Sequence, residues 1–119
     1  MPNFSCQDVV TINAYSTVPN ILAGNRFERV PYAIGQGKLL VAGSALGLTV
    51  ELNIGGRSIT PAVAVNEQDR LPVEPDDTLA KDIQAFAGEL IQITVVNPTA
   101  GNLDFYYRFE MDEMEYQQG

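Results

Sequence analysis

The chain has 119 residues, enough for one domain with its own hydrophobic core, and 45% of them are hydrophobic. Its formal net charge is −8, from 15 acidic and 7 basic residues, so its surface repels phosphates and disfavours a nucleic-acid partner. The lack of histidine and the single cysteine, Cys6, exclude a Ser-His or Cys-His nucleophile, an imidazole-bound metal and an intrachain disulfide. Cys6 itself is expected to be a small buried hydrophobe.

The first ten residues, MPNFSCQDVV, contain no basic region and no long apolar run, so no signal peptide is expected. Apolar runs elsewhere are only a few residues long, which is too short for a membrane-spanning helix. We therefore expect synthesis in the cytoplasm and no membrane partner.

Alternating apolar and polar residues predict strands along nearly the whole chain. In chain order, strands are expected at 7–15, 25–33 and 37–44, in a hairpin over 48–65, and at 82–87, 89–96 and 103–111. Within the hairpin, Gly55-Gly56 provides a two-residue turn with positive φ angles. Pro61 lacks an N–H donor and is expected at a sheet edge, at a bulge or beyond the strand end.

The segments ELIQITVV (89–96) and LDFYYRFEM (103–111) alternate most clearly. Phe105 and Tyr107 are expected in the core, since they share the apolar face of the second segment. The turn-forming residues NPTAGN separate the two segments. This spacing predicts that the two segments pair as an antiparallel hairpin.

About eight short strands separated by Gly, Pro and Asn clusters predict a single all-β domain over residues 1–119. The expected architecture is a two-sheet antiparallel β-sandwich, jelly-roll-like in its connections. At most one short helical turn is expected, near 76–83, where an N-cap and a stop signal are present but the alternation also fits a strand. The C-terminal tail, about 112–119, is expected to fray.

The segment RLPVEPDDTLAKDI (70–83) gathers three carboxylates, Glu74, Asp76 and Asp77. Calcium prefers such oxygen ligands, so these residues are the candidates for a metal site. The spacing of a calcium loop is absent, however, and adjacent aspartates in an extended segment point in opposite directions. The favoured interpretation is a proline-stiffened connection whose carboxylates face solvent or cap backbone N–H groups.

The other polar features are typical of solvated surface or of a protein contact. Tyr106 and Arg108 are of the residue types enriched at interface hot spots, and EMDEMEY (110–116) mixes acids with adaptable methionines. The 15 acids supply many carboxylate pairs, but no credible acid–base pair stands out, so neither an enzyme nor a cofactor is expected. The candidate contact residues are Pro75, Asp76, Asp77, Tyr106, Arg108, Glu113 and Met114.

Four segments, taken together, resemble small β-rich structural proteins of tailed bacteriophages, including capsid cement or decoration proteins. They are NILAGNRFERVPY (20–32), NIGGRSI (53–59), LPVEPDD (71–77) and AGELIQITVVNPTAG (87–101), so the resemblance covers about residues 20 to 111. It implies a jelly-roll-like sandwich, a homotrimer, with the major capsid protein as partner and the virion surface as location. No catalytic or ligand-binding residue is carried over from it.

We therefore expect a virion structural protein that binds the outer capsid surface and stabilises the assembled shell. One alternative is a phage neck, tail or fibre component, which the sequence does not separate from a cement protein. The other is a carbohydrate- or calcium-binding β-sandwich, although the chain has no tryptophan for stacking on a sugar.

Overall fold

A computed structural model describes residues 3–24, 28–65, 67, 71–72 and 77–114. In this part of the chain every regular element is a β-strand, and it contains no helix that could span a membrane. The strands are β1 Asn3–Ile12, β2 Ser16–Val18, β3 Ile34–Gly43, β4 Thr49–Ile54, β5 Arg57–Ala64, β6 Thr78–Phe86, β7 Ile91–Asn97 and β8 Leu103–Glu113.

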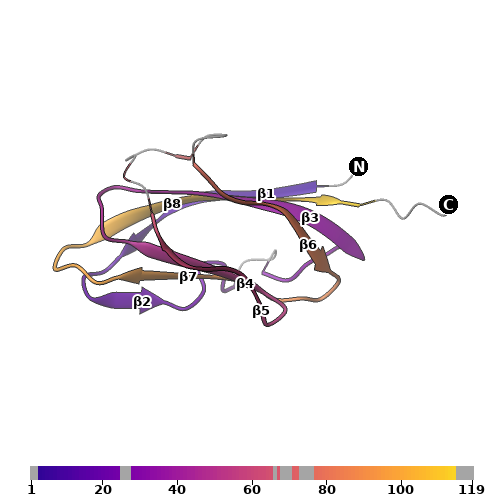
Figure 1. Cartoon of the computed structure of the whole chain (residues 1–119), viewed down its shortest axis with the longest axis horizontal. Helices are drawn as coiled ribbons and strands as arrows, with labels where there is room; N and C mark the ends of the chain where they lie inside the picture. Colours follow the sequence, from indigo (N-terminus) through magenta and orange to yellow (C-terminus); the bar gives the residue numbers. More distant parts are fainter. Residues whose placement is uncertain (1–2, 25–27, 66, 68–70, 73–76, 115–119) are drawn as a thin grey trace.

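The strands form two four-stranded sheets that pack face to face, with orders β1-β8-β3-β6 and β2-β7-β4-β5 (Figure 1). Four antiparallel pairs, β1–β8, β2–β7, β3–β6 and β4–β5, are those of one long hairpin with its tip between β4 and β5. Rolling this hairpin adds the pairs β3–β8 and β4–β7, which complete the two sheets. The strand order is that of an eight-stranded jelly roll, so the expectation of a jelly-roll-like two-sheet sandwich is confirmed.

The tip of the long hairpin has the predicted turn. Gly55 and Gly56 have φ angles of 60° and 81°, values that favour glycine and give the twist a two-residue hairpin requires. Pro61 lies in β5, which is an edge strand. The register between β5 and β4 shifts around Pro61, as seen from the pairs of Val63 with Val50 and of Thr60 with Leu52. Pro61 thus occupies both an edge and a bulge, as its missing N–H predicts.

The hairpin expected between residues 89–96 and 103–111 is wrong. Both segments are strands, but β7 pairs with β2 and β4 in one sheet, whereas β8 pairs with β1 and β3 in the other. The connection after Asn97 crosses from one sheet to the other. Turn-forming residues permit either a hairpin or a crossing between the sheets, and the outcome depends on which distant strand each segment pairs with.

Two further expectations need correction. The expected strand at 25–33 does not form in its described part, where Arg29 makes only an isolated bridge to Leu90. Pro31 has no N–H with which to continue a ladder, and the chain turns instead toward β3. The helical turn considered near 76–83 is replaced by β6, in which Ile83 and Ala85 alternate into the core.

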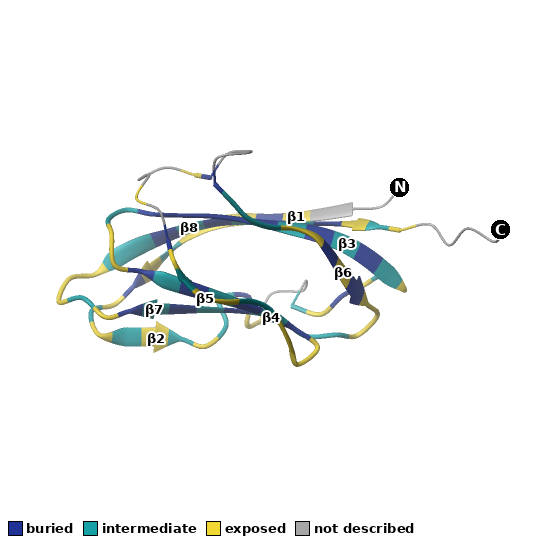
Figure 2. Ribbon diagram, in the orientation of Figure 1, coloured by how far each residue is buried: buried dark blue, intermediate teal, exposed yellow. Residues whose placement is uncertain are grey.

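The core lies between the sheets and follows the alternation of the strands (Figure 2). In β8 the side chains of Phe105, Phe109 and Met111 are completely buried, and Tyr107 is nearly so, as expected. Cys6 is also buried, as its small apolar character predicted. The completely buried large side chains are Phe105, Phe109, Ile12, Leu22, Leu39, Leu40, Leu48, Leu52, Ile54, Ile91, Ile93 and Met111.

The end of β8 extends beyond its expected limit at residue 111. Asp112 pairs with Asn3, and Glu113 pairs with Gly35. β8 therefore continues two residues into the expected tail: Asp112 has paired neighbours on both sides, Asn3 and Gln36, and Glu113 has one on the β3 side. Residues 115–119 lie outside the described part of the chain.

Candidate functional site

The side of sheet β1-β8-β3-β6 that faces away from the second sheet carries the best candidate site, and we call it the outer face. Because side chains alternate along β8, Phe105, Tyr107 and Phe109 point into the core, while Tyr106 and Arg108 point to the other side of the sheet. Tyr106 and Arg108 are therefore both on the outer face, on the polar side of the strand that the sequence indicated. Each is partly buried.

One half of the outer face is covered. Leu40 and Ala42 pair in register with Arg108 and Tyr106 and are completely buried, although neither belongs to the cluster between the sheets. Beside them, the backbone N–H of Val41 donates to the carbonyl oxygen of Asp77 at 3.0 Å. Tyr106 and Arg108 lie beside this covered half, and 37% of the Arg108 side chain remains exposed.

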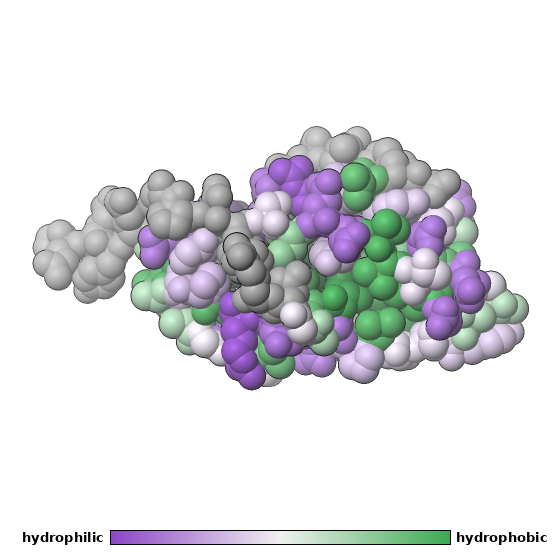
Figure 3. All heavy atoms as spheres, turned by 180° about the vertical axis from the view of Figure 1, so that it is seen from behind, coloured by the Kyte–Doolittle hydropathy of each residue, from purple (hydrophilic) through white to green (hydrophobic). Residues whose placement is uncertain are grey.

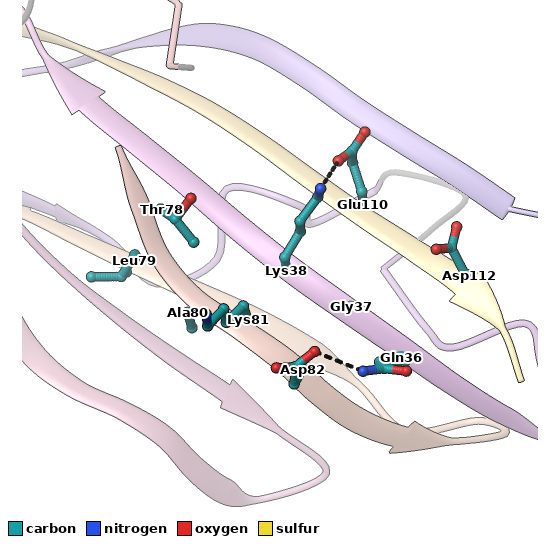
Figure 4. Close-up of a pocket in the computed structure, with 10 residues that line it drawn as sticks. All are labelled: Gln36, Gly37, Lys38, Thr78, Leu79, Ala80, Lys81, Asp82, Glu110 and Asp112. Carbon is teal, nitrogen blue, oxygen red and sulfur yellow. Dashed lines mark hydrogen bonds and ion pairs between the residues drawn. The ribbon is translucent and has the colours of Figure 1, made fainter. Parts of the chain in front are cut away.

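The other half of the outer face is an open polar groove of about 900 Å³ over β3, β6 and the end of β8 (Figure 4). Its lining combines two lysines and three carboxylates with neutral polar and small apolar side chains. The groove residues are Gln36, Gly37, Lys38, Thr78, Leu79, Ala80, Lys81, Asp82, Glu110 and Asp112.

Ion pairs and hydrogen bonds connect the strands across this groove. Glu110 is shared between two cations, with its Oε1 2.6 Å from Arg108 Nη2 and its Oε2 3.3 Å from Lys38 Nζ. The amide of Gln36 donates to Asp82 Oδ1 at 2.8 Å, which links β3 to β6. Partly exposed pairs of this kind contribute about 0–1 kcal/mol each, so they order the groove more than they stabilise the fold.

Asp82 occupies an unusual backbone position. Its φ angle is 55°, in the left-handed region that aspartate tolerates better than most residues. The register of β3 with β6 shifts between Gly37 and Leu39, next to this residue. The bulge turns the Asp82 carboxylate toward Gln36 and gives this side of the groove its shape.

The C-terminal end of β8 places a tyrosine near two carboxylates. Burial and the charges of Glu113 and Asp112 raise the pKa of Tyr32 above its ordinary value, so this phenol remains a neutral hydrogen-bonding group. Met114 is 41% exposed, and its backbone N–H donates to the carbonyl of Ile34 at 2.9 Å. The candidate contact residues Glu113 and Met114 therefore lie at the end of β8 beyond the groove.

Of the three acids of the segment 70–83 that the sequence indicated, the structure describes only Asp77. Asp77 is only 3% exposed, so the expectation that its carboxylate faces solvent is wrong. The reason is that its backbone pairs with β3 at Val41, which places it against the sheet at the start of β6. Its side chain is not accessible to a partner in this conformation. Glu74, Pro75 and Asp76 lie outside the described part of the chain.

Sequence reasoning missed the groove residues Gln36, Lys38, Lys81 and Asp82. The available signal was local: Gln36 and Lys38 are the polar positions of an alternating strand. Gln36 and Lys38 lie close to Asp82 and Glu110 because of the register of three strands that are far apart in the sequence. No local pattern specifies that register.

The chain matches no protein-family model and no curated protein. Where the structure places residues, no group of three or more Cys, Asp or Glu side chains is positioned to hold a metal ion. The groove offers fixed donors and acceptors of both charges, with Lys38, Glu110 and Asp82 already engaged. Such a surface suits recognition of another polar surface through hydrogen bonds and exchange of ion-pair partners.

Proposed function

We propose that this protein is a virion structural protein, a capsid decoration or cement protein that binds the outer capsid surface and stabilises the assembled shell. The observation that carries the proposal is the strand order of the two sheets, because the eight-stranded jelly roll is a recurrent architecture of viral capsid domains. The resemblance of residues 20 to 111 to β-rich proteins of tailed phages supports the same assignment.

A decoration protein acts through binding linkage. A ligand that binds only the assembled lattice stabilises that lattice by RT ln(1 + [L]/Kd), about 2.7 kcal/mol per site when its concentration is 100 times Kd. A homotrimer multiplies weak contacts, since the second and third contacts of a bound trimer become intramolecular. Trimerisation and the major capsid protein as partner are parts of this proposal.

The groove is the proposed contact surface for the capsid. Its lysines and carboxylates complement a capsid surface that carries charges of both signs, and rearranged ion pairs give specificity more than affinity. Met114, at the end of β8, adds an adaptable apolar contact. Loss of a groove charge is therefore expected to weaken capsid binding without unfolding the protein.

Lectin domains share the jelly-roll architecture, so a carbohydrate-binding protein is the second candidate. Sugars are commonly held by stacking on aromatic rings, and the groove lining contains none. A neck or tail component would differ from a decoration protein in its copy number per virion, which is much lower.

The experiment adds the purified chain to capsids that lack it and measures co-sedimentation and the melting temperature of the shell. We expect saturable binding to the capsid and a higher shell melting temperature. Absence of both would overturn the proposal, whereas binding restricted to the neck or tail would favour the alternative.

A matched pair of variants tests the contact surface. Lys81→Gln removes one positive charge from the groove, and Thr17→Glu makes the same change in net charge on the exposed surface of β2 in the other sheet. We expect Lys81→Gln to weaken capsid binding and Thr17→Glu to leave it unchanged. Equal effects of the two variants would mean that overall charge, not the groove, governs the contact.

A further inference from the structure

The four edge strands of the sandwich differ in how they are protected from pairing with another chain. β2 has three residues, β5 contains Pro61 and a bulge, and β6 contains the left-handed Asp82 beside a register shift. Short length, proline and bulges are known ways in which proteins block exposed edges. β1 has none of these features. Its ten residues pair with β8 in one unbroken register, from Asn3 opposite Asp112 to Ile12 opposite Leu103.

No described strand pairs with β1 on the side opposite β8, and this open edge presents backbone hydrogen-bonding groups. The N–H of Val9 points away from β8 and donates to the carboxylate Oδ1 of its neighbour Asp8 at 2.8 Å. In an antiparallel strand every second residue directs its N–H and C=O to the same side, so Gln7 and Thr11 share the outward direction of Val9. An incoming strand would meet a regular row of backbone donors and acceptors. At the centre of this row the Asp8 carboxylate already accepts from the N–H of Val9.

Apolar side chains lie beside the polar ones at this edge. Val9 is 45% exposed on the outer face, and Val10, Val18 and Ile21 are only partly buried at the opening between β1 and β2. Figure 3 shows apolar side chains gathered on the face of the molecule that lies behind the view of Figure 1, where β1 and β2 are the edge strands. An added strand would cover part of this surface with every second side chain.

The charge of β1 and β8 determines what kind of strand fits. Together they carry five carboxylates and a single guanidinium, that of Arg108, which is engaged with Glu110. A second copy of the chain would pair β1 with β1 and bring two Asp8 side chains close together, between molecules that each carry a net charge of −8. Like charges on neighbouring strands are destabilising, so the edge disfavours self-pairing and favours a basic occupant.

We propose that the open edge of β1 binds an extended basic segment of a partner protein as an added strand, with Asp8 selecting the positive charge. On binding, the Asp8 carboxylate exchanges the N–H of Val9 for a lysine or arginine of the segment, and the Val9 N–H then donates to the backbone of the added strand. This surface lies on the opposite side of the sandwich from the edge at which β6 borders the groove, and its occupant need not be a capsid protein.

The probe is a blocked peptide of the length of β1, in which valine alternates with threonine and lysine. Its controls are the same peptide with glutamate in place of lysine and the same peptide N-methylated on the residues that would face β1. Binding is measured by calorimetry and by amide exchange of the isotope-labelled chain. We expect the basic peptide to bind, to slow exchange at Gln7, Val9 and Thr11, and to bind more weakly as salt is added.

Variants of the chain test the two parts of the proposal. Val9→Pro removes the central outward donor, and an edge strand tolerates proline where the N–H does not serve the ladder. Asp8→Lys reverses the selecting charge on an exposed side chain. We expect Val9→Pro to weaken binding of the basic peptide about tenfold or more, and Asp8→Lys to transfer the preference to the acidic peptide. If Val9→Pro does not fold, Asp8→Lys and the N-methylated peptide still decide the question.

Several results would overturn the proposal. These are no binding of the basic peptide, equal binding of the N-methylated or acidic peptide, or protection of amides elsewhere than on β1. Self-association of the wild-type chain through the β1 amides would also overturn it, because the occupant would then be a second copy.

Discussion

The side-chain amide of Asn97 donates to the carbonyl oxygen of Ile12 at 2.9 Å and so joins the end of β7 to the end of β1, in the opposite sheet. The same amide donates to the carbonyl of Gly101 at 2.8 Å, and Asn97 Oδ1 accepts from the backbone N–H and the hydroxyl of Thr99. Asn97 is completely buried. One side chain therefore fixes the crossover that takes the chain from one sheet to the other.

Asn97→Ala is expected to lower the free energy of unfolding by about 3 kcal/mol. It leaves the buried carbonyl of Ile12 without the amide donor and removes the Oδ1 acceptor of Thr99, whereas the carbonyl of Gly101 keeps the Thr99 hydroxyl as a donor. A buried polar group left unpaired costs about 1–3 kcal/mol. Denaturant titration measures the loss. Asn102→Ala is the control, since Asn102 accepts one exposed hydrogen bond from the N–H of Ala14 at 2.9 Å. A similar loss of unfolding free energy in both variants would show that the effect of Asn97→Ala does not come from the burial of Asn97.

The tip of the long hairpin allows a comparison of two adjacent glycines. Gly55 and Gly56 both have positive φ, so alanine strains the backbone at either position by about 1 kcal/mol. A Cβ at Gly56 meets nothing within 4 Å, whereas a Cβ at Gly55 would collide with the Glu89 carboxylate. That carboxylate accepts from Arg57 Nη2 and from the N–H of Phe86, each at 2.8 Å.

Gly55→Ala is therefore expected to cost about 1–2 kcal/mol more than Gly56→Ala, because Glu89 must leave both of its donors. Thermal or denaturant unfolding of the two variants measures the difference. In a Glu89→Ala background the two glycine substitutions should become nearly equal. A difference that persists without Glu89 would place its cause in the backbone.

The phenol of Tyr107 makes stability depend on alkaline pH. Burial, followed by the charges of Asp8 and Cys6, raises the pKa of Tyr107 above its ordinary value of 10.0. The native state therefore keeps this proton at a pH at which the unfolded chain releases it. Stability from this group is complete below pH 10.0 and is lost as the pH rises from there toward the higher native pKa.

Tyr107→Phe should make the free energy of unfolding less steeply dependent on pH above the ordinary tyrosine pKa. Unfolding measured across the alkaline range tests this, and the ultraviolet absorbance of tyrosinate follows the titration itself. Asp8→Asn should shift the titration of Tyr107 to lower pH, because it removes one charge that opposes deprotonation. An unchanged titration in Asp8→Asn would contradict the position of Asp8 beside Tyr107.

The ion pairs of the groove are expected to contribute little to stability. Glu110→Gln weakens the pairs with Arg108 and Lys38, yet the free energy of unfolding should change by less than about 1 kcal/mol, and by less still in high salt. Phe109→Ala, one residue away but in the core, should cost about 3–5 kcal/mol. Denaturant titrations of both variants at two salt concentrations make the comparison. A large loss in Glu110→Gln would mean that the groove is structural.

The sequence by itself determined the features that depend on neighbours along the chain. Side chains in a strand alternate with a period of two residues, so the apolar face of residues 103–111 was readable, and with it the burial of Phe105 and Tyr107. The Gly55-Gly56 turn and the edge position of Pro61 were equally local, because they follow from one residue's φ angle and another's missing N–H.

The tertiary structure alone decided which strands pair. A turn-forming segment permits either a hairpin or a crossing between sheets, and in the crossing the buried amide of Asn97 joins the end of β7 to the end of β1 in the opposite sheet. The groove exists because Lys38, Asp82 and Glu110 come together from three strands whose register is set by burying their opposite faces. The burial of Asp77 and the open edge of β1 have the same origin, since both depend on contacts between residues far apart in the sequence.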